Sequence, residues 1–114
     1  MYELIVKKSR FLGYVKQIET AQQAKDFIAD ITTQNKKARH VCFAYVLDNA
    51  EKYSDAGEPS GTAGLPILSA IKRREIKNVC VVVVRYFGGI LLGKGGLLRA
   101  YGKCAGKTLD TLQE

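Results

Sequence analysis

The sequence predicts an α+β domain, a two-layer sandwich in which helices cover one face of a four-stranded mixed sheet. Two observations predict this class. Strand-like and helix-like segments follow one another in the order ββαβαβα, with no internal repeat. The segment Val79–Phe87 contains a continuous apolar run, which is typical of a central strand buried on both faces. With 114 residues, 46% of them hydrophobic, the chain supports one core, and we expect a single domain over residues 1–114.

The first two strands and the first helix are predicted from residue type and turn chemistry. Tyr2–Val6 and Phe11–Ile18 are rich in β-forming residues and flank the basic turn Lys7–Arg10, which favours an antiparallel pair. Thr20 is a suitable N-cap for a helix that runs to about Asn35. The apolar side chains of this helix recur at i, i+3, i+4 and i+7: Ala24, Phe27, Ile28 and Ile31.

The remaining elements alternate between strand and helix. A third strand, Val41–Leu47, is followed by the polar segment Asp48–Tyr53, for which we expect a loop. Pro66 suits the first turn of a second helix that ends near Arg74, because its missing N–H has no partner there. After the central strand, a last helix spans about residues 95–112. One face of this helix carries the apolar stripe Leu98, Tyr101, Ala105, Leu109 and Leu112.

Composition argues against several classes of protein. No apolar run approaches the roughly 20 residues of a membrane helix, and Met1–Lys8 lacks a signal-peptide core, so we expect neither membrane insertion nor export. The cysteines form no CxxC pair: Cys42, Cys80 and Cys104. They indicate buried thiols in a reducing, cytoplasmic compartment, and we expect no zinc site, disulfide or cofactor. The net charge of +7 favours an acidic partner such as RNA or the ribosome.

Glycines concentrate in two short segments. Eight of the 11 fall in Ser54–Gly64 and Arg85–Arg99, and each segment leads into a predicted helix. Glycine is favoured where the backbone needs positive φ or where another group approaches it closely. The two segments therefore predict one concave site, built from backbone and a few polar side chains.

The second segment is similar to a phosphate-binding loop. Gly88 and Gly93 are separated by four residues and followed by Lys94, in the strand–loop–helix context of a Walker A motif. Gly95 stands where that motif needs a hydroxyl for magnesium, so we expect anion binding at the helix start without nucleotide hydrolysis. The candidate anion-binding residues are Arg85, Gly88, Gly89, Lys94, Gly95, Gly96 and Arg99.

A basic track follows this loop along the last helix. Arg99, Lys103 and Lys107 recur at i, i+4 and i+8, beside the apolar stripe. This pattern fits a phosphate-binding surface, and it fits equally an ordinary solvated helix face. An aromatic side chain beside the loop would stack on a base. The candidate nucleic-acid contacts are Arg85, Tyr86, Lys94, Arg99, Lys103 and Lys107.

The first glycine segment holds the acids and hydroxyls of a candidate polar site: Ser54, Asp55, Glu58, Ser60 and Thr62. The carboxylates suit acid–base work or cation binding. The local alternative is turn formation, with Ser60 or Thr62 capping the next helix, and we favour capping for these two hydroxyls. We expect both carboxylates within side-chain reach of Arg85 or Arg99, which would join the two segments in one site.

The single histidine, His40, and Cys42 lie two residues apart and would share a face of the third strand. No third group that would orient them is evident. A histidine at the start of a strand, beside a buried cysteine, explains the pair without catalysis. We therefore assign no catalytic residue and no metal site.

Together, the glycine segments resemble a known family. Ser54–Gly64 (SDAGEPSGTAG) is similar to the pattern SDDGEP-[SA]-GTAG, and Arg85–Tyr101 (RYFGGILLGKGGLLRAY) is similar to RYFGG-x2-LG-x-GGL-x-[RK]-AY. These are motifs of the Impact family in its bacterial YigZ-type form, which KKSRFLG and ARHVCFAYV also resemble. The likeness runs from about Val6 to Leu112. Ala56 stands where the family usually has a second aspartate, a departure that disfavours a metal-dependent role for the loop.

The resemblance implies the fold seen in a small-subunit ribosomal protein and in domain IV of elongation factor G, with a left-handed βαβ crossover. Bacterial relatives typically carry a second, ferredoxin-like domain, which we expect to be absent from this chain, an N-terminal Impact domain that is either a fragment or a short form. Eukaryotic relatives regulate translation under amino-acid starvation by competing for a co-activator of an initiation-factor kinase. The resemblance thus implies a non-enzymatic, translation-associated module that binds RNA, the ribosome or a translation-regulatory protein. The alternative is a hydrolase or small-anion enzyme that uses both loops, with Asp55 and Glu58 as acid–base groups.

Overall fold

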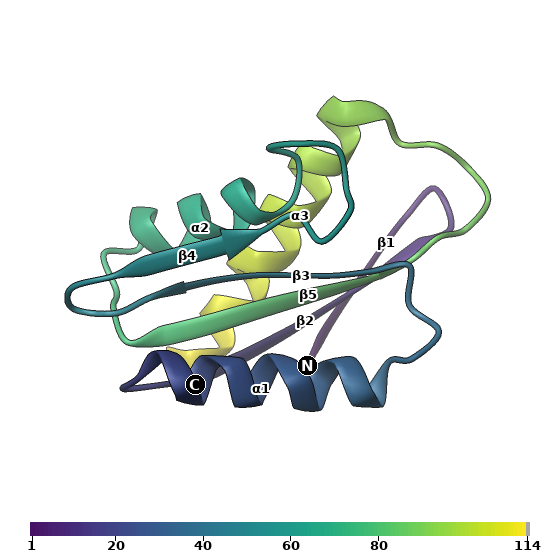
Figure 1. Cartoon of the computed structure of the whole chain (residues 1–114). Coiled ribbons are helices and arrows are strands. Elements are labelled where there is room, and N and C mark those ends of the chain that lie inside the picture. The colour runs from purple at the N-terminus through teal and green to yellow at the C-terminus, as the bar shows by residue number, and fades with distance from the viewer. Residues whose placement is uncertain (114) are drawn as a thin grey trace.

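The strands form one antiparallel sheet in the order β1-β2-β5-β3-β4, in a computed structural model that describes residues 1–113 (Figure 1). The strands are β1 (Tyr2–Val6), β2 (Ser9–Gln17), β3 (His40–Val46), β4 (Glu51–Ser54) and β5 (Val79–Tyr86). The helices are α1 (Ala21–Gln34), α2 (Gly64–Arg73) and α3 (Gly93–Asp110), and a short 3-10 turn, Thr111–Gln113, follows α3. The α+β class is confirmed, and β5 is the central strand as predicted.

The sheet has five strands and is antiparallel throughout, so the prediction of four strands in a mixed sheet was wrong. The missed strand is β4, which lies in the segment expected to be a loop, and the chain order becomes ββαββαβα. β4 is an edge strand that pairs only with β3, and three of its four residues are exposed. Short, charged edge strands lack the apolar alternation that identifies a strand in a sequence.

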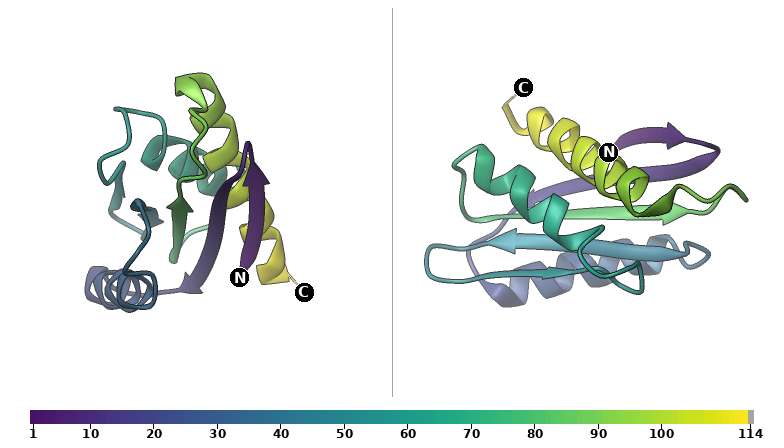
Figure 2. Two further views of the ribbon diagram at one scale, coloured as in Figure 1. Left: turned by 90° about the vertical axis from the view of Figure 1, so that its right-hand side faces the viewer. Right: turned by 90° about the horizontal axis from the view of Figure 1, so that it is seen from above.

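Helices cover both faces of the sheet, so the prediction of helices on one face was also wrong. α2 and α3 lie on one face and α1 lies on the other, as Figure 2 shows. Val81 and Val83 of β5 join the core under α2 and α3, whereas Val82 and Val84 join the core under α1. A strand that is buried on both sides needs a covering layer on each of them.

Two crossovers connect parallel strands within this sheet. β2 and β3 are both antiparallel to β5, so they run parallel, and α1 connects them; β4 and β5 are parallel in the same way, and α2 connects them. Each crossover can be viewed from the same side of the sheet with its two parallel strands pointing up. Seen in this way, both crossovers move from the first strand to the second in the same direction. Their helices lie on opposite faces, so the two crossovers have opposite hands. One is therefore left-handed, against the usual rule, and Figure 2 shows that it is β4–α2–β5.

Local signals set the ends of two elements. Thr20 caps α1 as predicted, because its hydroxyl oxygen accepts the N–H of Gln23 at 3.1 Å. Lys7 and Lys8 both have positive φ and form the two-residue turn of the β1–β2 hairpin. Turns of this kind match the right-handed twist of the strands that they join.

The buried stripe of α3 differs from the predicted one at its first residue. Tyr101, Ala105 and Leu109 are buried as predicted, whereas Leu98 is 50% exposed and Leu97 is buried instead. The buried face of α3 also includes Ala100, Cys104, Gly106 and Thr108. Leu98 is therefore turned to the outer edge of the helix, where it borders a groove beside α2. Within residues 1–113, no helix combines the length and the apolar composition of a membrane span.

Candidate functional site

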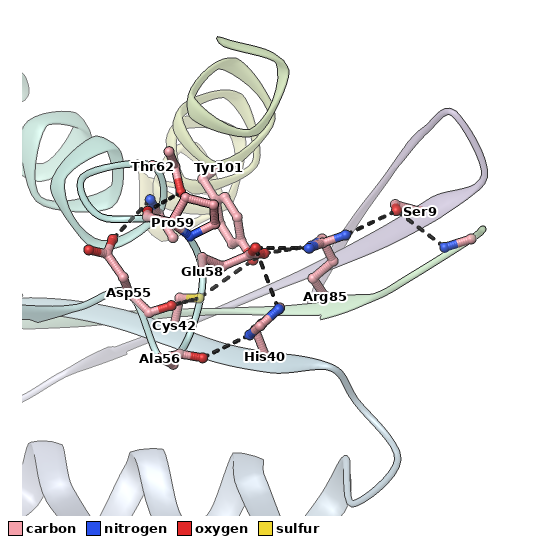
Figure 3. A network of polar contacts seen from close by, with 12 residues as sticks. Ser9, His40, Cys42, Asp55, Ala56, Glu58, Pro59, Thr62, Arg85 and Tyr101 are labelled. Atoms are coloured by element: carbon pink, nitrogen blue, oxygen red, sulfur yellow. Dashed lines mark hydrogen bonds and ion pairs between the residues drawn. The ribbon is translucent and has the colours of Figure 1, made fainter. Parts of the chain in front are cut away.

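The two glycine segments meet at a buried carboxylate. Glu58, in the loop after β4, is only 6% exposed. Its oxygens accept hydrogen bonds from Arg85 of β5, Nε to Oε2 at 2.6 Å and Nη2 to Oε1 at 2.8 Å (Figure 3). Arg85 is 7% exposed, so the two side chains form a buried, bidentate ion pair. The predicted contact between Glu58 and Arg85 is therefore present.

Two further side chains converge on the same carboxylate. Tyr101 of α3 donates its hydroxyl hydrogen to Oε2 of Glu58. Nε2 of His40, on β3, lies 3.5 Å from Oε1. Nδ1 of the same ring lies 2.8 Å from the carbonyl oxygen of Ala56, which can only accept, so Nδ1 carries a proton. Figure 3 shows β3, β5, α3 and the loop after β4 meeting at this one carboxylate.

Burial and the contacts with Glu58 together set the protonation of this cluster. Burial raises the pKa of Tyr101 far above the ordinary value, so the phenol remains a hydrogen-bond donor. For Arg85, burial acts to lower the pKa, but the bonds to Glu58 outweigh it and the pKa is raised, so the guanidinium stays charged. Burial also raises the pKa of the Cys42 thiol to about 12. The Cys42 sulfur lies 3.3 Å from the carbonyl oxygen of Asp55 and 3.5 Å from the Tyr101 hydroxyl.

Ser9, at the start of β2, connects the cluster to the second glycine segment. Its Oγ lies 3.5 Å from Nη1 of Arg85 and accepts the N–H of Gly88 at 3.3 Å. A Cβ on Gly88 would lie 2.2 Å from the backbone of Lys8, so glycine allows the β1–β2 turn to pack against this loop. Sequence reasoning missed Ser9: it lies in the KKSRFLG stretch, outside both glycine segments, and was given no role. It also missed the role of the Tyr101 hydroxyl, because the helical pattern placed that residue only in the core.

Asp55 caps α2 instead of approaching an arginine. Its Oδ2 accepts the N–H of Gly61 at 2.9 Å, and its Oδ1 accepts those of Ala63 and Gly64 at 3.1 and 2.8 Å. Burial acts to raise the pKa of Asp55, but the three backbone N–H donors hold it below its ordinary value. The predicted contact with an arginine is therefore present for Glu58 and absent for Asp55. The Asp55 carboxylate accepts hydrogen bonds only from backbone N–H groups among the described contacts.

The hydroxyls of the same loop do not cap α2, so the capping prediction for Ser60 and Thr62 was wrong. Thr62 donates its hydroxyl hydrogen to the carbonyl of Pro59 at 2.5 Å, and Ser60 is exposed. The Oγ of Ser54 accepts the N–H of Ala56 at 3.1 Å. The loop folds back on itself and brings a carboxylate to the helix start from nine residues upstream, which a local capping pattern does not reveal.

Both carboxylates of this region accept hydrogen bonds from within the protein. The Glu58 carboxylate accepts hydrogen bonds from Arg85 and Tyr101 and faces the His40 ring, and the Asp55 carboxylate accepts three backbone N–H groups. The ring nitrogens of His40 face Ala56 and Glu58, so the structure forms no Cys–His pair among the described contacts. Across the described part of the chain, no three His, Cys, Asp or Glu side chains come together as metal ligands.

A second feature, here called the basic groove, lies between the β1–β2 hairpin and α3. Its volume is about 160 Å³, and its polar lining consists of Lys7 from the hairpin with Arg99 and Lys103 from α3. Lys94 is exposed in the first turn of α3, whose start has no side-chain cap. The structure therefore brings two of the basic residues predicted along α3, Arg99 and Lys103, together with Lys7 in one groove.

The cations around the groove have no acidic partners among the described residues. The ion pairs of residues 1–113 engage other basic groups: Arg10, His40, Lys72, Arg74 and Arg85. The unpaired cations near the hairpin and along α3 are Lys7, Lys8, Lys94, Arg99, Lys103 and Lys107. Lys7 and Lys8 were missed as contributors, although a basic pair in a predicted turn was a visible signal.

Two of the residues predicted to contact nucleic acid, Arg85 and Tyr86, lie outside the basic groove. Arg85 is in the buried cluster, engaged with Glu58. Tyr86 is half-buried, and its hydroxyl donates to Oδ1 of Asn35 at 2.6 Å. Gly88 and Gly89 lie in the loop before α3, and Gly95 and Gly96 lie in its first turn. The basic groove is therefore built by α3 and the hairpin, without the side chains at the end of β5.

The sequence is similar to curated bacterial and eukaryotic proteins. Residues 7–109 match the Impact N-terminal domain. IMPACT family member YvyE of Bacillus subtilis is 48% identical over 112 residues, which cover 96% of this chain and 52% of the relative. IMPACT family member YigZ of Escherichia coli is 40% identical over 112 residues, which cover 94% of this chain and 55% of the relative. The chain thus spans about half the length of the curated relatives that it matches.

Solved structures agree with the sequence comparison. The crystal structure of a hypothetical protein superimposes with a TM-score of 0.91 at 38% identity, covering 96% of this chain and 55% of the other. The two-domain translational regulator Yih1 has a TM-score of 0.60 at 23% identity, covering 96% of this chain and 44% of the other, and therefore shares the fold. The family match covers most of the chain, in agreement with the two glycine motifs. This chain belongs to the Impact family, through its N-terminal domain.

Proposed function

We propose that this domain is a non-enzymatic, translation-associated module that binds single-stranded RNA along the basic groove and α3. The observation that carries the proposal is the row of cations beside that groove, which have no acidic partners among residues 1–113, in a chain of net charge +7. Binding of a polyanion to such a row is driven by counterion release. The translational role of Yih1, which shares the fold, adds support to an association with translation.

The spacing of the cations suits an extended polyanion. Arg99, Lys103 and Lys107 are all exposed and follow one another at intervals of about 6 Å along the helix axis. Lys7 lies on the opposite wall of the groove from Arg99 and Lys103. A strand of RNA in the groove would therefore meet cations from two elements, and its bases would remain free to face outward.

The buried cluster supports binding over hydrolysis. The enzyme alternative needs Asp55 and Glu58 as acid–base groups, yet each carboxylate already accepts hydrogen bonds from internal partners. The three cysteines are free and buried, which fits a reducing cytoplasm, where translation takes place. We therefore place this module in the cytoplasm, with RNA or the ribosome as its partner.

A pair of charge reversals with a matched control tests this proposal. The site variant carries Lys103→Glu and Lys107→Glu, and the control carries Lys25→Glu and Lys52→Glu, which make the same charge change at exposed positions away from α3. Fluorescence anisotropy of a labelled oligouridine at low salt should show at least about tenfold weaker binding for the site variant alone. Equal affinities for the two variants would refute the assignment of RNA to this surface.

A further inference from the structure

The loop between β5 and α3 ends in an exposed apolar tip. Leu91 is 83% exposed and Ile90 is 42% exposed. Gly89 and Gly93 flank them with positive φ of 89° and 73°, and a Cβ on either glycine would meet nothing within 4 Å. Figure 1 shows this loop extending past the end of the sheet, on the same side as the β1–β2 turn. Neither apolar side chain contributes to a core.

Basic residues lie at both ends of this loop. Leu92 lines the basic groove together with Lys7, and Lys94 is exposed two residues later. Gly88, at the start of the loop, packs against the backbone of Lys8. Exposed apolar side chains that cluster beside one sign of charge mark an interaction site. The partner that fits is therefore anionic and offers an apolar surface to the tip.

We infer that Leu91, assisted by Ile90, is a wedge that inserts against the bases of the RNA strand whose phosphates lie in the basic groove. The inference rests on the proposed function and adds the residue that contacts bases. Apolar side chains inserted between base steps unstack them and are a known means of holding nucleic acid. In this arrangement the lysines and Arg99 hold the backbone, and the leucine supplies a contact that salt does not screen.

The layout of the cations favours RNA over an anionic membrane. Arg99, Lys103 and Lys107 run down α3 for about 12 Å, away from the tip. A membrane contact would need the cations in one plane around the apolar side chains, which is the arrangement of an interfacial anchor. A linear track that leads to a wedge instead fits a chain polymer, with phosphates along the track and a base at its end.

Paired serine substitutions test the wedge. Leu91→Ser removes it, and Leu98→Ser removes another exposed leucine, on α3 at the groove beside α2. Leu91→Ser should weaken binding of the labelled oligouridine about tenfold, since roughly one buried leucine contact is lost. The dependence of affinity on salt should stay unchanged, because no phosphate contact is lost. Leu98→Ser should bind as the wild type does, and circular dichroism should show both variants folded.

A tryptophan reporter gives a second readout, because the chain contains no tryptophan. In Leu91→Trp, oligouridine should quench the indole fluorescence through stacking and should bind at least as tightly as to the wild type. In Leu98→Trp, the fluorescence should not respond. Vesicles of phosphatidylserine and phosphatidylcholine should leave both reporters unchanged.

The outcomes separate the wedge from the proposed function. If the Lys103 and Lys107 reversals weaken binding while Leu91→Ser binds normally, RNA binding stands and the wedge is refuted. If the wild type binds no more tightly than the reversals, the proposed function fails and the wedge fails with it. A blue shift of Leu91→Trp on vesicles, without quenching by oligouridine, would assign the tip to a membrane and overturn the inference.

Discussion

Glu58 and Arg85 join the two glycine-rich segments through two hydrogen bonds of 2.6 and 2.8 Å between almost completely buried side chains. The carboxylate comes from the loop before α2, and the guanidinium comes from the end of β5. Tyr101 of α3 donates to the same carboxylate. The pair therefore fixes the loop against the sheet and, through Tyr101, against the middle of α3.

The first prediction concerns this pair. Glu58→Gln keeps the shape of the side chain but leaves the buried Arg85 without its counter-charge, so the free energy of unfolding should fall by about 3–5 kcal/mol. Glu51→Gln is the matched control, because Glu51 pairs with Lys72 at 3.0 Å on the surface and should contribute only about 0–1 kcal/mol. Urea unfolding of both variants measures the difference. Equal losses would show that the buried pair has no special role in stability.

Asp55 should make stability depend on pH in the acid range. Its pKa is lower in the folded protein than the ordinary 3.8, so the unfolded chain takes up the proton first. The stability that Asp55 contributes is therefore fully present at pH values above its ordinary pKa of 3.8, and it is lost as the pH falls through the lower pKa of the folded protein. Asp55→Asn should lower stability by about 1–2 kcal/mol at pH 7 and should flatten the acid loss.

Urea unfolding between pH 2 and 7 checks the Asp55 prediction. Asp30→Asn, on the exposed face of α1, removes the same charge without removing a cap and controls for net charge at pH 7. An Asp55→Asn variant that is as stable as Asp30→Asn at neutral pH would show that the three backbone contacts do not hold the start of α2.

Two glycine-to-alanine changes should act in opposite directions. A Cβ on Gly88 would lie 2.2 Å from the Lys8 backbone, so Gly88→Ala should push the hairpin away and lower stability by about 1–3 kcal/mol. A Cβ on Gly102, within α3, would make an ordinary 3.7 Å contact with Pro66, so Gly102→Ala should raise stability by about 0.5–1 kcal/mol. Thermal unfolding measures both changes, and a neutral Gly88→Ala would contradict the packing of the hairpin on this loop.

The three thiols should be inert in the folded protein. Burial raises the pKa of Cys42, Cys80 and Cys104 to about 12 in each case. At pH 8, only about one such thiol in ten thousand is ionised, and only the thiolate attacks a disulfide reagent. A colorimetric disulfide reagent should titrate all three rapidly in guanidinium chloride and none on the same timescale in native buffer. Rapid modification of a single thiol in native buffer would reveal local opening around that residue.

The sequence predicts the helices and strands of this fold well where the apolar residues follow a strong local pattern. It predicts them less well where contacts between distant segments determine the structure. The apolar run of β5 and the cap at Thr20 were local signals, and both predicted their elements correctly. β4 was missed because it is a short strand at the edge of the sheet, where charged side chains such as Glu51 and Lys52 stay exposed to solvent. It therefore lacks the apolar pattern that marks a strand in a sequence. The second helical layer was implied by the continuous burial expected for β5, since one layer of helices cannot cover two faces.

The candidate site shows the same division. The contact between Glu58 and Arg85 follows from two recognisable motifs, so it was open to prediction from sequence. The cap that Asp55 provides depends on the loop folding back over nine residues, and the contact of Ser9 with Gly88 spans 79 residues. No local pattern encodes such contacts. The basic pair Lys7–Lys8 was visible in the sequence, but its position beside Arg99 and Lys103 was not, because it depends on the packing of β1 and β2 against α3.

The central claim is that the basic groove and α3 bind the phosphates of RNA, and the salt dependence of oligouridine affinity tests it most directly. The wild type should lose affinity steeply as salt rises. Each lost phosphate contact should flatten the log–log slope by about 0.7, so reversal of Lys103 and Lys107 should flatten it by at least about 1.4. Arg99→Ala should weaken binding more than either single lysine reversal, because a guanidinium can hold a phosphate bidentately. Identical weak binding and identical slopes for the wild type and the reversal variant would contradict the account.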